Sequence, residues 1–200
     1  MGRALGLDKC PVFVETGDAY VTTEFGKDIP DYPTKGKKGD HWGLDIVRRI
    51  NNSNTTATIC AIADGIIYAQ RKYVKDGEKT PSGGNCVYIR HDNGMVSKYL
   101  HFKEKSVPDW VKDNVPVKKG EVIGFMGSTG NSYGAHLHFQ VEDKDGNPVD
   151  PEPYLTGKKI IDKDEVFYQV IIGEFNAENK AKEIQSALKA LGTPSCIEKI

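Results

Sequence analysis

The chain contains the stretch Gly127-Ser-Thr-Gly-Asn-Ser-Tyr-Gly-Ala-His-Leu-His-Phe139, in which a glycine-rich turn runs into a short alternating segment. Side chains two apart on a β-strand point to the same face, so His136 and His138 should project together. Leu137 and Phe139 then turn toward a core. The stretch therefore predicts a strand that presents two imidazoles to one site.

The sequence around this stretch also has the pattern of an antiparallel β protein. Apolar runs at 57–63, 65–69, 86–90, 96–100 and 122–126 are separated by turns such as Asp64-Gly65 and Lys119-Gly120. One helical turn is expected within 107–115, begun by Pro108 and ended by Pro116. The expected fold class is mainly β, an antiparallel sheet or sandwich that forms a catalytic domain.

The character of the sequence changes after the three prolines of 147–153. Residues 166–172 are rich in β-formers, and 179–191 carry apolar residues at helical spacing before Gly192, a typical helix stop. These patterns predict a small C-terminal βαβ segment. We place the boundary near Gly157, which gives a first domain over 1–157 and a second segment over 158–200.

The composition excludes several classes of partner. With 27 basic and 28 acidic residues the net charge is -1, so neither nucleic acid nor an anionic membrane is indicated. No apolar run has the length of a membrane span or a signal peptide, so we expect synthesis in the cytoplasm without membrane insertion. The four cysteines form no C-x-x-C pair and are expected to be free thiols, with a Cys60–Cys86 disulfide as the less favoured alternative.

Two further motifs supply groups that suit a metal, His41-Trp-Gly-Leu-Asp45 and Tyr99-Leu-His101. A fully extended chain would hold His41 and Asp45 about 13 Å apart, so both reach one ion only if the chain bends, and Gly43 is the natural place because glycine tolerates unusual backbone angles. Taken alone, each motif also fits an ordinary solvated turn or hydrogen-bonded histidines. Zinc prefers such nitrogen and oxygen ligands, and a catalytic zinc keeps three protein ligands. Two of the four histidines would then serve chemistry, and spacing leaves open which two.

These motifs, in this order and after Thr23-Glu-Phe-Gly26, resemble those of the lysostaphin/LytM-type zinc metallopeptidases. The resemblance covers about 21–155. It implies that His41, Asp45 and His138 bind zinc, while His101 and His136 form the catalytic pair. Gln140 departs from the glutamate that is common after the His-Leu-His-Phe run, which should alter contacts around the site without loss of the metal. His91, in a turn, is expected to be structural.

The resemblance implies a peptidoglycan endopeptidase that acts on the bacterial cell wall, with the stem peptide or cross-bridge as substrate. A wall hydrolase without a signal peptide fits a phage or prophage endolysin. Glycine-rich segments at 83–84 and 127–134 are expected to form groove walls. Tyr32, Asn131 and Tyr133 are candidate groove contacts, although the role of an ordinary turn residue is favoured for each.

Two rival functions are weighed against this one. A catalytically inactive LytM-like protein that activates other hydrolases would lack some ligands, and this chain lacks none. A biotinyl or lipoyl carrier is suggested by Val117-Lys-Lys-Gly-Glu-Val-Ile-Gly124, but the lysine hairpin that a carrier needs is absent.

The C-terminal segment resembles the first half of a SPOR domain, a module associated with peptidoglycan glycan strands. A segment of about forty residues is near the lower limit for independent folding and leaves open strand edges. We hypothesise that two such segments complete one sheet in a homodimer; the alternative is that the segment packs on its own catalytic domain.

Overall fold

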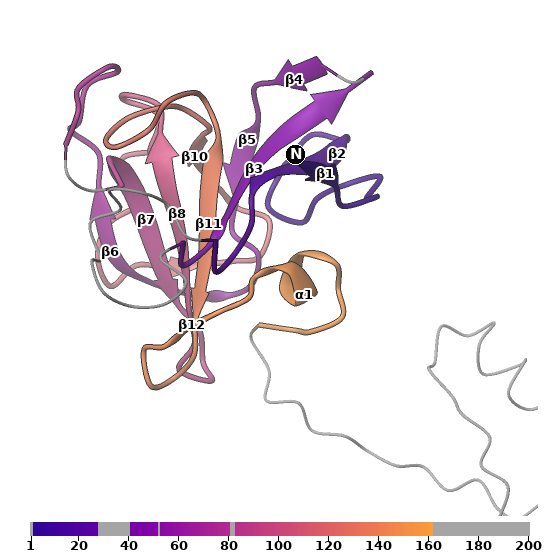
Figure 1. The fold of residues 1–200 in the computed structure, drawn as a ribbon. Helices are drawn as coiled ribbons and strands as arrows, with labels where there is room; N and C mark the ends of the chain where they lie inside the picture. Colours follow the sequence, from indigo (N-terminus) through magenta and orange to yellow (C-terminus); the bar gives the residue numbers. More distant parts are fainter. Residues whose placement is uncertain (1, 28–40, 52, 81–82, 162–200) are drawn as a thin grey trace, which may run out of the picture. The chain divides into compact units, whose positions relative to one another are not determined.

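The computed structural model describes residues 2–27, 41–51, 53–80 and 83–161 of the chain (Figure 1). The chain divides into the units Met1–Glu165 and Val166–Ile200. The expected βαβ segment, the SPOR-like resemblance, the tail-mediated dimer and Tyr32 all lie outside the described residues. Within those residues, no helix has the length and apolar character needed to cross a membrane.

The regular structure of the described chain consists almost entirely of antiparallel strands, which confirms the predicted mainly β fold class. The elements are β1 (Arg3–Ala4), β2 (Asp18–Thr23), β3 (Leu44–Ile50), β4 (Ser53–Thr55), β5 (Thr58–Cys60), β6 (Gly65–Arg71), β7 (Asn85–Arg90), β8 (Val96–Phe102), β9 (Pro116–Val117), β10 (Val122–Phe125), β11 (Leu137–Glu142), β12 (Pro148–Val149) and α1 (Glu152–Leu155).

The strands form one large sheet and one small sheet. The large sheet has the order β1-β2-β3-β11-β8-β7-β6-β9, while β5 and β10 pair separately. Figure 1 shows β6, β7, β8 and β11 side by side. Leu137, Phe139 and Tyr99 of the large sheet are fully buried and share one core with Ile59 and Ile123 of the small one. The alternation predicted for Leu137 and Phe139 is confirmed.

The sheet contains a fork at β3. Because β2 pairs with β3 over Asp18–Thr23, both β11 and β4 must use the opposite edge of β3. β11 pairs with its first part, where His138 lies opposite Asp45, and β4 pairs with its last part, where Thr55 lies opposite Arg48. The β3–β4 hairpin therefore diverges from β11 just beyond the predicted metal site.

One local expectation was wrong, and the expectation of free cysteines is confirmed for Cys60 and Cys86. The predicted helical turn at 107–115 is a pair of non-helical turns, in which Val111 N–H donates to the Pro108 carbonyl and Val115 N–H to the Lys112 carbonyl. Pro116 begins β9 there, since an edge position needs no N–H. The alternative disulfide is absent: Cys60 and Cys86 are free and buried, on different sheets.

Candidate metal centre and active site

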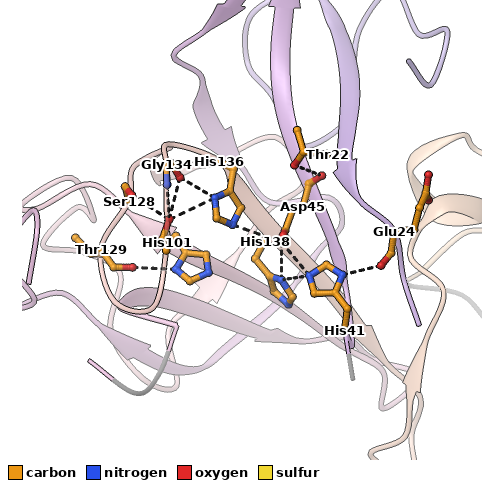
Figure 2. Close-up of polar contacts among 11 residues, drawn as sticks. Thr22, Glu24, His41, Asp45, His101, Ser128, Thr129, Gly134, His136 and His138 are labelled. Atoms are coloured by element: carbon orange, nitrogen blue, oxygen red, sulfur yellow. Dashed lines mark hydrogen bonds and ion pairs between the residues drawn. The ribbon is translucent and has the colours of Figure 1, made fainter. Parts of the chain in front are cut away.

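The structure brings three of the five predicted site residues together in one cluster. The His41 Nε2, Asp45 Oδ1 and His138 Nδ1 atoms are separated by 3.0, 2.9 and 3.1 Å around the triangle that they form. His41 and His138 are buried, and Asp45 is partly exposed. Figure 2 shows the two rings turned toward the Asp45 carboxylate. The three groups form an arrangement that could hold a metal ion.

The dimensions and the protonation pattern of this cluster fit zinc. Ligand atoms at zinc-bond distances in a tetrahedral site lie about 3.4 Å apart, close to the observed triangle. His41 Nδ1 lies 2.8 Å from the Glu24 carbonyl oxygen, a bond that only an Nδ1–H can make. A ring with its single proton on Nδ1 carries a lone pair on Nε2, and this atom faces Asp45 Oδ1. A cation between these acceptors would relieve their repulsion.

Gly43 produces the bend that brings His41 toward Asp45, but not for the predicted reason. The chain bends at this residue, directly before β3. Gly43 is not among the glycines with positive φ. Instead, a Cβ atom there would lie 2.5 Å from the Phe139 carbonyl oxygen and 2.7 Å from His138 Nε2. Glycine is required because β11 approaches so closely, which was not evident from the sequence.

His101 and His136 lie beside this cluster, with ring centroids 4.7 Å apart. The Nδ1 of each ring donates to a backbone carbonyl, of Thr129 for His101 and of Gly134 for His136, both at 2.8 Å. His136 Nε2 is 3.4 Å from Asp45 Oδ1. The two backbone contacts hold both rings as the tautomer whose Nε2 is free to accept a proton.

A β-bulge directs His101 into the site. Between the pairs Val87–Tyr99 and Asn85–Phe102, β7 has one residue and β8 has two, Leu100 and His101. His101 has φ of 64°, in the left-handed region that non-glycine residues rarely adopt. Tyr99 and Phe102 point into the core on either side. The extra residue breaks the alternation of β8 and re-aims one side chain, which is a common use of bulges near active sites.

Burial and mutual contacts determine the ionisation of the cluster. Burial disfavours the Asp45 carboxylate, but the contacts with His136, His138 and His41 outweigh it and hold the pKa of Asp45 well below its usual range. Burial and the neighbouring His136 lower the pKa of His101 to about 3. Burial also lowers the pKa of His138. In His136, the Asp45 carboxylate overcomes the effect of burial and raises the pKa. Asp45 is thus anionic, and His101 and His138 are neutral at pH 7.

An open cleft runs from these histidines into the fork between β11 and the β3–β4 hairpin. Asn131 and Tyr133, two of the three candidate contacts, line one wall on the loop that leads into His136. Thr22 and Asn54 line the opposite wall, and Val47 contributes to the lining between them. The expectation for Gly83 and Gly84 was wrong, because they do not line the cleft; they pack closely against Leu100 and Thr129 instead.

Several residues that support the site were not singled out from the sequence. Ser132 Oγ lies 2.9 Å from both Ser128 Oγ and the Gly134 carbonyl oxygen, and 3.4 Å from His136 Nδ1. Lys79 donates to the Ser132 carbonyl from a distant loop. The serines lie in the glycine-rich stretch and could have been suspected, whereas the carbonyl partners Glu24 and Thr129 act through their backbone and leave no sequence signal.

Gln140 and His91 are involved in contacts away from the cluster. Gln140 Nε2 donates to Glu142 Oε1 at 2.9 Å and touches none of the three clustered groups at a hydrogen-bond distance. His91 is buried and hydrogen bonds to the Asp64 carbonyl and to Ser97 Oγ, at 2.7 and 2.8 Å. These contacts give His91 the structural role that was expected.

Comparison with known proteins agrees with the resemblance to zinc metallopeptidases that the sequence motifs indicated. The model of peptidase family M23 matches residues 39–151. The chain is 34% identical over 109 residues to the peptidoglycan DD-endopeptidase ShyC of Vibrio cholerae, covering 54% of this chain and 22% of ShyC. It is 32% identical over 128 residues to the glycyl-glycine endopeptidase ALE-1 of Staphylococcus capitis, covering 62% of this chain and 31% of ALE-1. The chain thus spans less than a third of either relative.

A solved structure supports the fold in the same way. The antimicrobial peptidase lysostaphin from Staphylococcus simulans matches with a TM-score of 0.50 and 24% identity, covering 80% of this chain and 58% of that one. At this identity the likeness concerns the fold alone.

Proposed function

Because the chain belongs to peptidase family M23, we propose that it is a zinc-dependent endopeptidase that hydrolyses peptide bonds in bacterial peptidoglycan. The observation that carries the proposal is the convergence of His41, Asp45 and His138 on one point, with His101 and His136 beside them at the end of an open cleft. Relatives described as peptidoglycan DD-endopeptidase and glycyl-glycine endopeptidase support a peptide of the wall as substrate.

His41, Asp45 and His138 would hold the zinc through the atoms that already face one another. Zinc bound there would polarise the scissile carbonyl and lower the pKa of a water molecule to about 7. The Glu24 carbonyl keeps the lone pair of His41 Nε2 directed at the ion by holding the proton on Nδ1. Asp45 stays ionised at every pH at which the enzyme would work, so its charge is available to bind the ion.

His101 and His136 would carry out the proton transfers. While neutral, a ring whose Nδ1 donates to a backbone carbonyl can only accept at Nε2, and once protonated it can donate there. One ring therefore takes the proton of the attacking water and the protonated ring passes it to the leaving amine. The other ring, when protonated, hydrogen bonds to the oxyanion of the tetrahedral intermediate.

The cleft suits an extended peptide that approaches the histidines from the fork. Its lining outside the five site residues is uncharged, including Thr22, Thr23, Asn54, Asn131 and Ser132. Such a lining would hold the peptide by its backbone amides without a charged side chain. Both the stem peptide and the cross-bridge of peptidoglycan offer such segments. An inactive activator of other hydrolases is disfavoured because none of the five groups is missing.

The cellular part of the proposal is a phage or prophage endolysin whose C-terminal segment, 158–200, pairs with a second copy and binds glycan strands. Lysis of permeabilised cells by added protein tests the first point. Light scattering of the full chain and of a variant ending at Gly157 tests the second, since only the full chain should dimerise.

The enzymatic proposal is tested with purified peptidoglycans of known cross-bridge and two sets of variants. Wild-type protein should release fragments whose masses identify the cut bond. His136→Ala and His101→Ala should retain one zinc per chain and release nothing, whereas His138→Ala, His41→Ala and Asp45→Ala should lose both zinc and activity. A metal-free His136→Ala protein that is still folded would overturn the assignment of ligands, and wild-type protein that cuts no peptidoglycan would overturn the function.

A further inference from the structure

A fully exposed aromatic residue stands on the rim of the cleft, three positions before His136. Tyr133 lines the cleft and is 99% exposed. Exposed tyrosines in a soluble protein are ordinary when they are isolated, so the position is what distinguishes this one. Its loop is the same one that holds His136 through the Gly134 carbonyl. A ligand that reaches His136 along the cleft must therefore pass Tyr133.

The ring of Tyr133 is held in place although it is exposed. Lys79 Nζ lies 5.0 Å from the ring centroid, within the range of a cation–π contact. The same ammonium donates to the carbonyl of Ser132, the preceding residue. A second link joins the two loops, from Gly130 N–H to the Glu78 carbonyl at 3.2 Å. Residues 78 and 79 thus contact and support the loop of Tyr133, while the exposed surface of the ring remains open to a ligand.

The opposite wall is the β3–β4 hairpin, where Asn54 lines the cleft. The Asn54 Oδ1 accepts a hydrogen bond from Arg49 Nε at 3.0 Å, which fixes the side chain on its own hairpin. Arg49 in turn lies 3.6 Å from the centroid of the Tyr20 ring. Both walls of the fork are therefore anchored, and a chain lying between them meets an amide on one side and an aromatic ring on the other.

We propose that Tyr133 forms a substrate subsite, in which its ring stacks on the uncharged peptide segment next to the scissile bond. This inference rests on the proposed function and adds a residue that determines affinity for the substrate. The substrate segment that contacts Tyr133 is peptide and not glycan, because Tyr133 lies only three residues before His136, which acts on a peptide bond in the proposed function. The side chains that line the cleft around it are uncharged, so an uncharged substrate segment fits this position.

The subsite predicts a change in KM that leaves the chemistry intact. An aromatic contact of this kind contributes about a tenfold change in affinity, so Tyr133→Ala should raise KM about tenfold. The kcat and the zinc content should stay within about twofold, because Tyr133 touches neither the metal ligands nor the catalytic pair at a hydrogen-bond distance. Tyr133→Phe should keep most of the affinity, because the ring does the binding.

Tyr73 provides a matched control. It is also highly exposed, at 85%, but does not line the cleft. Cross-linked muropeptide dimers isolated from a peptidoglycan that the wild type digests would serve as the soluble substrate for all variants. Equal KM values for Tyr133→Ala and Tyr73→Ala would overturn the inference while leaving the proposed function in place.

Binding without turnover separates the two proposals further. The zinc-loaded His136→Ala protein and its Tyr133→Ala double variant should bind the same dimers with affinities about tenfold apart, as measured by calorimetry. Equal affinities would refute the subsite. If wild-type protein binds the dimers but cuts none, the proposed function fails and the comparison still decides the role of Tyr133.

Discussion

Replacing Gly43 with alanine should disturb the metal site through a backbone contact alone. The added Cβ would lie 2.5 Å from the Phe139 carbonyl oxygen and 2.7 Å from His138 Nε2, whereas ordinary contacts begin at 3.4 Å. β3 and β11 must therefore separate by about 0.7 to 0.9 Å, and overpacking of this kind costs about 1–3 kcal/mol of unfolding free energy. Zinc ligand distances tolerate only about 0.2 Å, so zinc affinity should fall by about 10- to 100-fold.

The assay is competition for zinc against a fluorescent chelator, combined with thermal unfolding of the zinc-free protein. Gly134→Ala is the control, because a Cβ there meets nothing within 4 Å and its φ is not positive. Gly134→Ala should match the wild type in both measurements. The close-packing argument is refuted if Gly43→Ala binds zinc within threefold of the wild type and unfolds at the same temperature.

Three more predictions follow from the site and the fold. His101→Gly should be about 1 kcal/mol more stable than His101→Ala, the reverse of the usual order in a strand, because glycine adopts the left-handed φ angle without strain. Urea unfolding of both variants measures the difference, and a more stable alanine variant would contradict the prediction. Zinc at about 100 times its dissociation constant should raise the midpoint temperature of thermal unfolding by about 5 to 10 °C, and a chelator should reverse this rise. An unchanged midpoint temperature in calorimetry would count against a zinc site in the folded protein. Burial raises the pKa of Glu15, but hydrogen bonds from Thr58 N–H and Oγ1 outweigh this, so its pKa is lowered. Glu15→Gln should therefore reduce the free energy of unfolding by about 1 kcal/mol at pH 7, and this loss should disappear as the pH falls below the usual glutamate pKa of about 4.3. A loss of stability that persists at about pH 2.5 would exclude the ionised carboxylate as its source.

The sequence predicted the strands and the clustering of His41, Asp45 and His138 well, because the motifs that carry them are local patterns. The alternation around His136 and His138 identified β11, and the apolar runs at 65–69 and 96–100 correspond to β6 and β8. The bend at Gly43 was also anticipated. These features are determined within a few residues of chain, where the period of a strand and the position of a glycine are informative.

Features that depend on contacts between distant segments were not predictable from the pattern. The fork at β3 follows from two strands sharing one edge, and Gly43 is required because β11 passes so close to it. The carbonyls of Glu24 and Thr129 orient imidazoles through atoms that every residue possesses. The helical turn expected at 107–115 failed because edge pairing of Pro116 competes with a weak local preference.

The bulge in β8 places a catalytic candidate on a single inserted residue. Deleting His101 would let β7 and β8 pair without interruption, while Tyr99 and Phe102 would keep their partners Val87 and Asn85 and the face that they share. The shortened strand would gain regularity while the imidazole disappeared from the cleft. Under the proposed function, a one-codon deletion would thus remove a proton-transfer group while leaving the residues proposed to hold the ion and the peptide in place.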